Sequence, residues 1–183
     1  MVIMETRVGG DRAKEIIDRL PFQGAIHTET IGYTWGLWLL WNTDRVEVTN
    51  LTSMEQEIHA SVKVKSSNLY WLFTTVYASP RFKERHFLWN NLKYVSSVHN
   101  LPWIIAGDFN ELLSSEETFG GRLVSLYRAN LFKECLDSYC IADLGFQGLR
   151  FTWTNKQDIT TFIQGRLDQF FVNSGWCVMY PKA

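Results

Sequence analysis

Residues 103–121 read WIIAGDFNELLSSEETFGG, a stretch that begins as an apolar strand and ends as a polar loop. The apolar run at 103–106 is typical of a buried β-strand. Asp108 and Asn110 follow it almost at once, with Phe109 between them. Carboxylates and carboxamides are costly to bury without partners, and both residue types also occur in turns. By itself, this stretch is interpreted equally well as a turn or as a functional site at a strand end.

The composition indicates a globular protein with a sizeable core. The chain has 183 residues, of which 46% are hydrophobic and 20% are charged, so we expect one domain. A net charge of -1 gives the whole chain no electrostatic attraction to nucleic acid, although a local basic patch stays open. The apolar run at 35–41 is too short to span a membrane, and residues 1–5 do not resemble a signal peptide.

The cysteines indicate a reducing compartment. They are odd in number and none belongs to a C-x-x-C pair, which argues against a disulfide framework and against a zinc site. The three residues are Cys135, Cys140 and Cys177. We therefore expect an intracellular protein.

The order of predicted elements points to the α+β class. We expect strands at 2–4, 36–41, 45–52, 57–65, 69–78, 103–110, 151–155 and 166–173, and helices at 11–20, 81–98 and 126–139. The segments 45–52 and 57–65 alternate polar and apolar residues, which predicts strands buried on one face. A doubly wound fold would alternate strands and helices regularly. This order instead predicts a four-layer α/β sandwich, with two mixed β-sheets packed face to face and helices outside.

Polar residues stand near the ends of several predicted strands. They are Glu5, Tyr77, Asp108, Asn110 and Asp168. Singly, Glu5 and Asp168 are interpreted as surface charges, and Tyr77 as a core aromatic residue whose hydroxyl has a partner. Sites on sheet scaffolds are commonly assembled from strand ends that are distant in sequence. Together, the five residues predict one convergent site.

Five motifs occur in an order that resembles the endonuclease/exonuclease/phosphatase superfamily, a group of magnesium-dependent phosphodiesterases with a DNase I-like fold. The motifs are METR at 4–7, VYASP at 76–80, WIIA at 103–106, GDFN at 107–110 and RLDQFFV at 166–172. Within the superfamily, three further stretches are most similar to the endonuclease domain of plant LINE-type (non-LTR) retrotransposon polyproteins. These are GLWLLWN at 36–42, GDFNELLSSEETFGG at 107–121 and FTWTN at 151–155.

The resemblance implies a role for each residue of the predicted site. Glu5 would be the acidic ligand of Mg²⁺, or of Mn²⁺ in its place. Asp108 would orient or deprotonate the attacking water, and Asn110 would hydrogen-bond the phosphate. Tyr77 would donate to a phosphate oxygen as charge develops there. Asp168 would orient a catalytic histidine. DNA is the implied substrate and the nucleus an implied location, whereas neither a membrane partner nor an oligomeric state is indicated.

The sequence departs from the family pattern in three places. The family has a strand with an Asn before the Glu5 position and a Ser-Asp-His element after the Asp168 position, and the 183 residues contain neither. The four histidines all precede Asp168, in contexts that do not match: His27, His59, His86 and His99. Trp35 stands where the subgroup has a small residue. The expectation is a single partial domain over 1–183, incomplete at both ends and derived from a partial or degenerate retroelement reading frame.

Three functions stay open at this point. The first is a Mg²⁺-dependent endonuclease that hydrolyses phosphodiester bonds, with DNA as substrate. The second is a catalytically dead remnant that lacks the terminal Ser-Asp-His, and the third is a phosphatase or deadenylase relative. GLWLLW and FTWTN favour the retroelement subgroup over the third function. Absence of the histidine favours the second over the first for this chain, so we expect nicking of DNA at close to the background rate.

Overall fold

The computed structural model describes residues 1–28 and 36–181, so the expectation about Trp35 lies outside the described residues. The strands are β1 Val2–Ile3, β2 Gly24–His27, β3 Trp38–Trp41, β4 Val46–Ser53, β5 Glu57–Val64, β6 Tyr70–Tyr77, β7 Trp103–Asp108, β8 Thr118–Phe119, β9 Ile141–Asp143, β10 Trp153–Thr154, β11 Gln164–Gly165 and β12 Asp168–Asn173. The helices are α1 Gly10–Ile17, α2 Phe82–Val98, α3 Leu126–Ser138 and α4 Ser174–Met179, with 3-10 turns at Ser115–Glu117 and Ile159–Thr161.

The largest sheet has six strands in the order β4-β5-β6-β7-β12-β9. It is mixed, because β6 and β7 are parallel while the other neighbours are antiparallel. Parallel neighbours need a long crossover, and α2 provides it between β6 and β7. This β6-α2-β7 unit brings the carboxyl ends of both strands to the same edge of the sheet.

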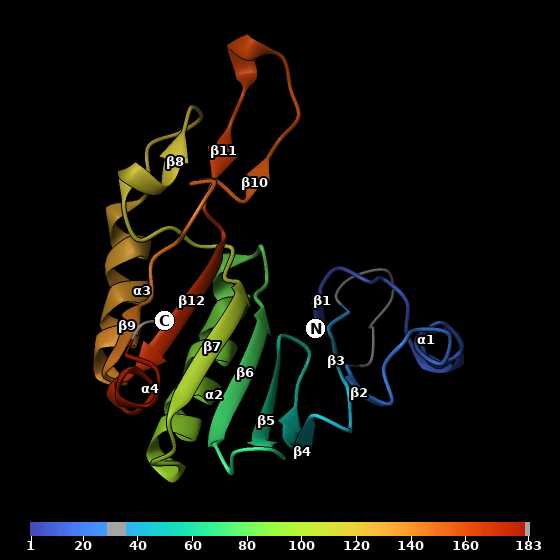
Figure 1. Cartoon of the computed structure of the whole chain (residues 1–183). Coiled ribbons are helices and arrows are strands. Elements are labelled where there is room, and N and C mark those ends of the chain that lie inside the picture. Colours follow the sequence, from blue (N-terminus) through green and yellow to red (C-terminus); the bar gives the residue numbers. More distant parts are fainter. Residues whose placement is uncertain (29–35, 182–183) are drawn as a thin grey trace.

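A smaller antiparallel sheet, β1-β3-β2, packs on one face of the six-stranded sheet. Leu39 faces Ile58 of β5, whereas Leu40 faces Ile17 of α1 on the outside. The continuous apolar run in β3 therefore has a physical reason, since both faces of that strand are covered. The layers are α1, the small sheet, the large sheet, and then α2 with α3 (Figure 1). The predicted α+β sandwich is confirmed.

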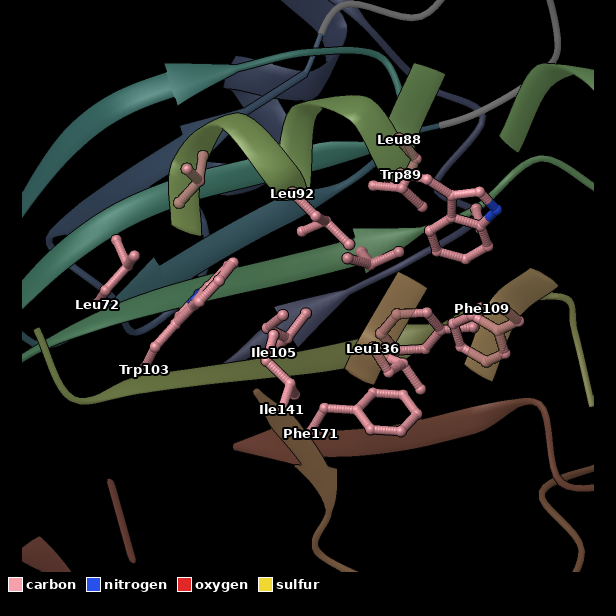
Figure 2. Packing of buried hydrophobic residues seen from close by; sticks show 14 residues of the cluster. Leu72, Leu88, Trp89, Leu92, Trp103, Ile105, Phe109, Leu136, Ile141 and Phe171 are labelled. Atoms are coloured by element: carbon pink, nitrogen blue, oxygen red, sulfur yellow. The ribbon is translucent and has the colours of Figure 1, made fainter. Parts of the chain in front are cut away.

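The main core lies between the large sheet and the helices α2 and α3. Figure 2 shows Leu88, Trp89 and Leu92 of α2 above the side chains of the sheet. Phe109 is fully buried here and lies edge-on to Phe171, with ring centroids 4.9 Å apart. The end of β7 is therefore anchored by an aromatic residue immediately after Asp108.

Several predictions about single elements were wrong. The strand at 57–65 was expected to be half-buried, but residues 57–62 of β5 are all buried because the small sheet and α2 cover its two faces. The first helix ends at Ile17 rather than at residue 20, and FTWTN contributes only the short strand β10. The strands β2, β8, β9 and β11 and the helix α4 were not predicted.

The third sheet, β10-β11-β8, is small and projects from the sandwich (Figure 1). Its strands have two residues each, so their pairing partners define them and their own sequence pattern does not. None of the helices within 1–28 and 36–181 is long and apolar enough to cross a membrane.

Candidate active site

The carboxyl ends of β6 and β7 place Tyr77 and Asp108 side by side. The two residues are register partners in the parallel pair β6–β7. Asp168, the first residue of β12, is the antiparallel partner of Asp108 on the other side. One edge of the large sheet therefore carries Tyr77, Asp108 and Asp168 in a row, although 91 positions separate the first from the last in the printed sequence.

Glu5 reaches this row from the small sheet. It follows β1, and its Oε1 accepts a hydrogen bond from the Tyr77 hydroxyl at 3.0 Å. This hydrogen bond joins the two sheets at the point where their edges meet. The METR motif therefore lies against the end of β6, as the convergence of the predicted site requires.

Asn110 is fixed against both β6 and β7. Its backbone N–H donates to Asp108 Oδ1 at 2.8 Å, and its side-chain Nδ2 donates to the carbonyl of Ala78 at 2.8 Å. The first contact is a side-chain turn of the kind that Asp forms two residues before its donor. The structure thus brings all five predicted residues to one place, while their catalytic roles stay predictions.

The backbone of the site occupies sparsely populated conformations. Glu5, Arg7 and Asn110 have φ angles of 55°, 50° and 47°, which are uncommon for residues with a side chain. Strain of this kind persists where the surrounding structure holds it, and it concentrates at functional sites. Half of the six non-glycine residues with positive φ in the described chain lie in this one place.

Gly107 explains the glycine of the GDFN motif. Its φ is +149°, and a Cβ there would lie 1.9 Å from the carbonyl oxygen of Val76. Any side chain would push β7 away from β6. Glycine is therefore needed directly before Asp108 to keep that carboxylate beside Tyr77.

The electrostatics of the site are unfavourable to the carboxylates. The pKa of Asp108 is raised to about 6, mainly by burial and also by the negative charges of Asp168 and Glu5, while the Asn110 N–H and Arg85 act in the opposite direction. Burial also raises the pKa of Tyr77, as do its hydrogen bond to Glu5 and the nearby carboxylates. Tyr77 therefore stays a protonated donor at neutral pH, and Asp108 is poised to gain or lose a proton.

The residues that support this edge of the sheet were not predicted from the sequence. Arg85 of α2 is fully buried, donates to the carbonyl of Ser79 at 2.6 Å and pairs with Glu111 Oε2 at 2.7 Å. Arg128 of α3 reaches the same carboxylate oxygen at 3.0 Å. One signal was present in the sequence: Arg85 interrupts the apolar stripe of α2 between Phe82 and Leu88. A charged residue at such a position needs a buried partner.

Mg²⁺ fits this site only as a weakly held ion. Glu5, Asp108 and Asp168 interact electrostatically, and a cation would relieve the charge that raises the pKa of Asp108. Within 1–28 and 36–181, however, no three His, Cys, Asp or Glu side chains have the geometry of a metal site. Mg²⁺ commonly keeps several waters and uses one or two carboxylates, so Glu5 with waters is a sufficient protein contribution.

No histidine stands beside Asp168. All four histidines of the chain are among the described residues, and no hydrogen bond or ion pair there joins one of them to Asp168. The backbone N–H of Asp168 instead donates to the Thr152 hydroxyl at 3.0 Å. His59 lies inside the large sheet, where its Nδ1 contacts Thr74.

The sequence matches the Endonuclease/Exonuclease/phosphatase family over residues 2–181. No curated protein matches the chain. Among solved structures, the endonuclease domain of TRAS1, a telomere-specific non-LTR retrotransposon, superposes with a TM-score of 0.64 at 14% identity, over 82% of this chain and 67% of that one.

Two further structures have the same fold. The human Nocturnin catalytic domain with bound sulfate gives a TM-score of 0.58 at 15% identity, over 94% of this chain and 68% of the other. D. rerio TDP2 complexed with single-strand DNA product gives 0.55 at 17% identity, over 94% and 70%. At these identities the likeness shows the shared fold alone.

Proposed function

We propose a function from one premise: this chain belongs to the Endonuclease/Exonuclease/phosphatase family. The proposed activity is hydrolysis of phosphodiester bonds, in DNA, supported by Mg²⁺. The observation that carries the proposal is the convergence of Glu5, Tyr77, Asp108, Asn110 and Asp168 at the meeting edge of two sheets.

Asp108 is the proposed base. Its pKa, raised to about 6, lets it accept a proton from a water molecule near neutral pH and release it afterwards. Asn110 is held by Asp108 and by the carbonyl of Ala78, so its amide is a fixed polar group beside that water. Tyr77 keeps its proton, and its hydroxyl would turn from Glu5 to donate to a phosphate oxygen once the substrate is bound. Hydrogen bonds hold each of these groups before the substrate arrives, which lowers the cost of ordering the reaction.

Glu5 is the proposed protein ligand of Mg²⁺. When bound, Mg²⁺ supplies charge neutralisation at a phosphate oxygen. The Glu5 carboxylate is oriented for this role by Tyr77, whose hydroxyl donates to Oε1 at 3.0 Å. The same hydrogen bond keeps Tyr77 at the substrate side of the sheet edge.

Asp168 lacks the histidine that the family resemblance assigns to it. General acid–base assistance of that kind is worth roughly 10²–10⁴-fold in rate. We therefore propose that the chain hydrolyses DNA close to the background rate, and that imidazole added to the solution restores part of the missing proton transfer at Asp168.

DNA and a LINE-type retrotransposon origin are proposed together. The order of METR, VYASP, GDFN and RLDQFFV, with GLWLLWN and FTWTN, supports the retroelement subgroup. The TRAS1 endonuclease domain has the highest TM-score of the three structures described above, and TDP2 is a fold relative in complex with a DNA product. A phosphatase activity is an outcome that the test below distinguishes.

The test is nicking of supercoiled plasmid in Mg²⁺, with and without imidazole. We expect imidazole to raise the rate for the wild-type chain, and Asp108→Ala to remove the rise. Asp44→Ala, an exposed carboxylate in the turn before β4, is the matched control and should behave as wild type. No nicking under either condition would favour the catalytically dead remnant. Hydrolysis of a phosphomonoester without nicking would favour a phosphatase.

A further inference from the structure

Two adjoining cavities form a groove between α2 and the β4–β5 hairpin. One has a volume of about 250 Å³ and the other about 420 Å³. Met54, Glu57 and Asn91 line both cavities, so the two are parts of one groove. Among the described residues that line it, none belongs to the candidate active site. The groove is therefore a separate feature from the sheet edge that carries Asp108.

The helix α2 presents an exposed apolar stripe to this groove. Phe87, Tyr94 and Val98 lie on one side of the helix, since they are spaced by seven and four residues, and they are 69%, 68% and 50% exposed. Leu51 and Met54 of the hairpin are also exposed and line the same groove. Single exposed apolar side chains are ordinary on a protein surface, but a contiguous set along a groove indicates an interaction site.

The carboxylates of the groove give it a negative charge. Glu55, Glu57 and Glu84 line the larger cavity, and neither Lys nor Arg occurs among the described residues that line either cavity. Glu84 is already paired, because Arg81 Nη1 lies 2.9 Å from its Oε1. Glu55 is exposed, and within 1–28 and 36–181 it takes part in no ion pair. Glu57 is 1% exposed, so it contributes charge rather than contact surface.

The charges of Glu55 and Glu57 select the kind of molecule that the groove accepts. The pKa of Glu57 is raised to about 7, mainly by burial and also by the charge of Glu55, while a hydrogen bond from Asn91 acts in the opposite direction. A cation held beside these two side chains would reduce their repulsion and favour the ionised form of Glu57. The phosphate backbone of a nucleic acid would instead be repelled.

The length of the groove fits a short stretch of polypeptide. Its lining on α2 extends from Glu84 to Val98, and these 14 steps at 1.5 Å per residue give about 21 Å. About six residues of extended chain cover the same distance. The three glutamates gather at the Glu84 end, whereas Tyr94 and Val98 make the other end apolar. A matching occupant is therefore basic at one end and apolar at the other.

We propose that this groove docks a basic, amphipathic segment of a partner protein, about six residues long in extended form. Lysine or arginine side chains at one end of the segment lie beside Glu55, with their aliphatic stems against Phe87. Apolar side chains at the other end occupy the cavity that Tyr94 and Val98 line. This interaction does not depend on phosphodiester hydrolysis, so it stands or falls independently of the proposed function.

The test uses the acetylated and amidated peptide Lys-Lys-Ala-Ser-Leu-Leu as the probe, titrated into the whole chain and followed by ¹H–¹⁵N NMR. We expect the backbone amide resonances of residues 54–57 and 84–98 to move, and the affinity to fall as salt is added. Two comparison peptides separate charge from apolar contact: Glu-Glu-Ala-Ser-Leu-Leu and Lys-Lys-Ala-Ser-Ser-Ser. Each should bind at least about ten-fold more weakly.

Two variants at exposed positions test the two kinds of contact without disturbing the core. Glu55→Lys should weaken binding of the basic peptide about ten-fold, while Glu134→Lys on the exposed side of α3 should leave it unchanged. Phe87→Ala should weaken binding about five-fold, and Phe119→Ala, which removes a ring that is 59% exposed, is its control.

Three results would overturn the proposal. The first is a basic peptide that moves no resonance of the groove, and the second is equal affinity for the basic and acidic peptides. The third comes from sedimentation equilibrium: a dimer of the chain that Phe87→Ala dissociates, and Phe119→Ala does not, would identify a second copy of this chain as the occupant.

Discussion

Asp108 and Phe109 are neighbours in the chain, yet they occupy opposite kinds of environment. The Phe109 ring is fully buried in the main core, with ring centroids 4.9 Å from Phe171 and 5.5 Å from Phe132. Asp108 is close to the carboxylates of Asp168 and Glu5, and its pKa is raised to about 6. One residue stabilises the fold, and the one before it opposes folding. Natural proteins keep unfavourable groups of this kind mainly where function needs them, which is why the contrast points to Asp108.

The largest effect on the free energy of unfolding should come from removing the Phe109 ring, the stabilising member of this pair. Phe109→Ala is expected to lower the free energy of unfolding by about 4 kcal/mol, because it removes a large ring from a fully packed site. Urea denaturation measures the change. Phe87→Ala in α2 is the control, since that ring is 69% exposed and its loss should cost less than about 0.5 kcal/mol. Similar losses in both variants would mean that the aromatic cluster does not anchor the strand end.

Removing Arg85, the buried partner of Glu111, should have the next largest effect on the free energy of unfolding. Arg85→Ala leaves Glu111 buried with only the partly exposed Arg128, and we expect a loss of about 3 kcal/mol. Arg81→Ala, which breaks an exposed pair one turn earlier in the chain, should cost less than about 1 kcal/mol. A small effect for Arg85→Ala in the same denaturation experiment would show that the Arg85–Glu111 pair is not needed to hold the loop after Asp108.

The destabilising effect of Asp108 can be measured from the pH dependence of the free energy of unfolding. The folded pKa of Asp108 lies above the ordinary value of 3.8, so the folded state holds the proton longer than the unfolded state. Stability contributed by the protonated form is present below about pH 4 and is lost as the pH rises towards 6. Asp108→Asn should therefore be more stable than wild type by about 2 kcal/mol at pH 7.5 and nearly equal to it at pH 4. A difference that is constant across this range would contradict the raised pKa.

The smallest effect concerns Mg²⁺. Weak binding at Glu5 should stabilise the fold by less than about 1 kcal/mol at about 10 mM Mg²⁺. Glu5→Gln keeps the size of the side chain and should abolish this increment in a thermal melt, whereas Glu47→Gln on the exposed side of β4 should leave it intact. An increment that survives Glu5→Gln would place the ion elsewhere.

The contrast at the end of β7 also shows what the sequence could predict. GDFN follows a strong apolar strand, and the parallel β6-α2-β7 unit does bring Asp108 beside Tyr77. The order of the family's motifs along the chain then assigned Glu5 and Asp168 to the site, which no local sequence pattern could do. Sequence patterns gave wrong or missing predictions where a tertiary contact decides whether a residue is buried. The alternation in β5 predicted an exposed face, but α2 covers it, and Arg85 was missed because its need for Glu111 is a tertiary contact.

We propose that Asp108 lowers stability and is retained for hydrolysis. The direct test is Asp108→Asn, measured both in urea denaturation at pH 7.5 and in imidazole-stimulated plasmid nicking with Mg²⁺. We expect the variant to gain stability while its nicking rate falls by about 100-fold or more, to the uncatalysed rate. A variant that loses stability, or that nicks plasmid as wild type does, would contradict it.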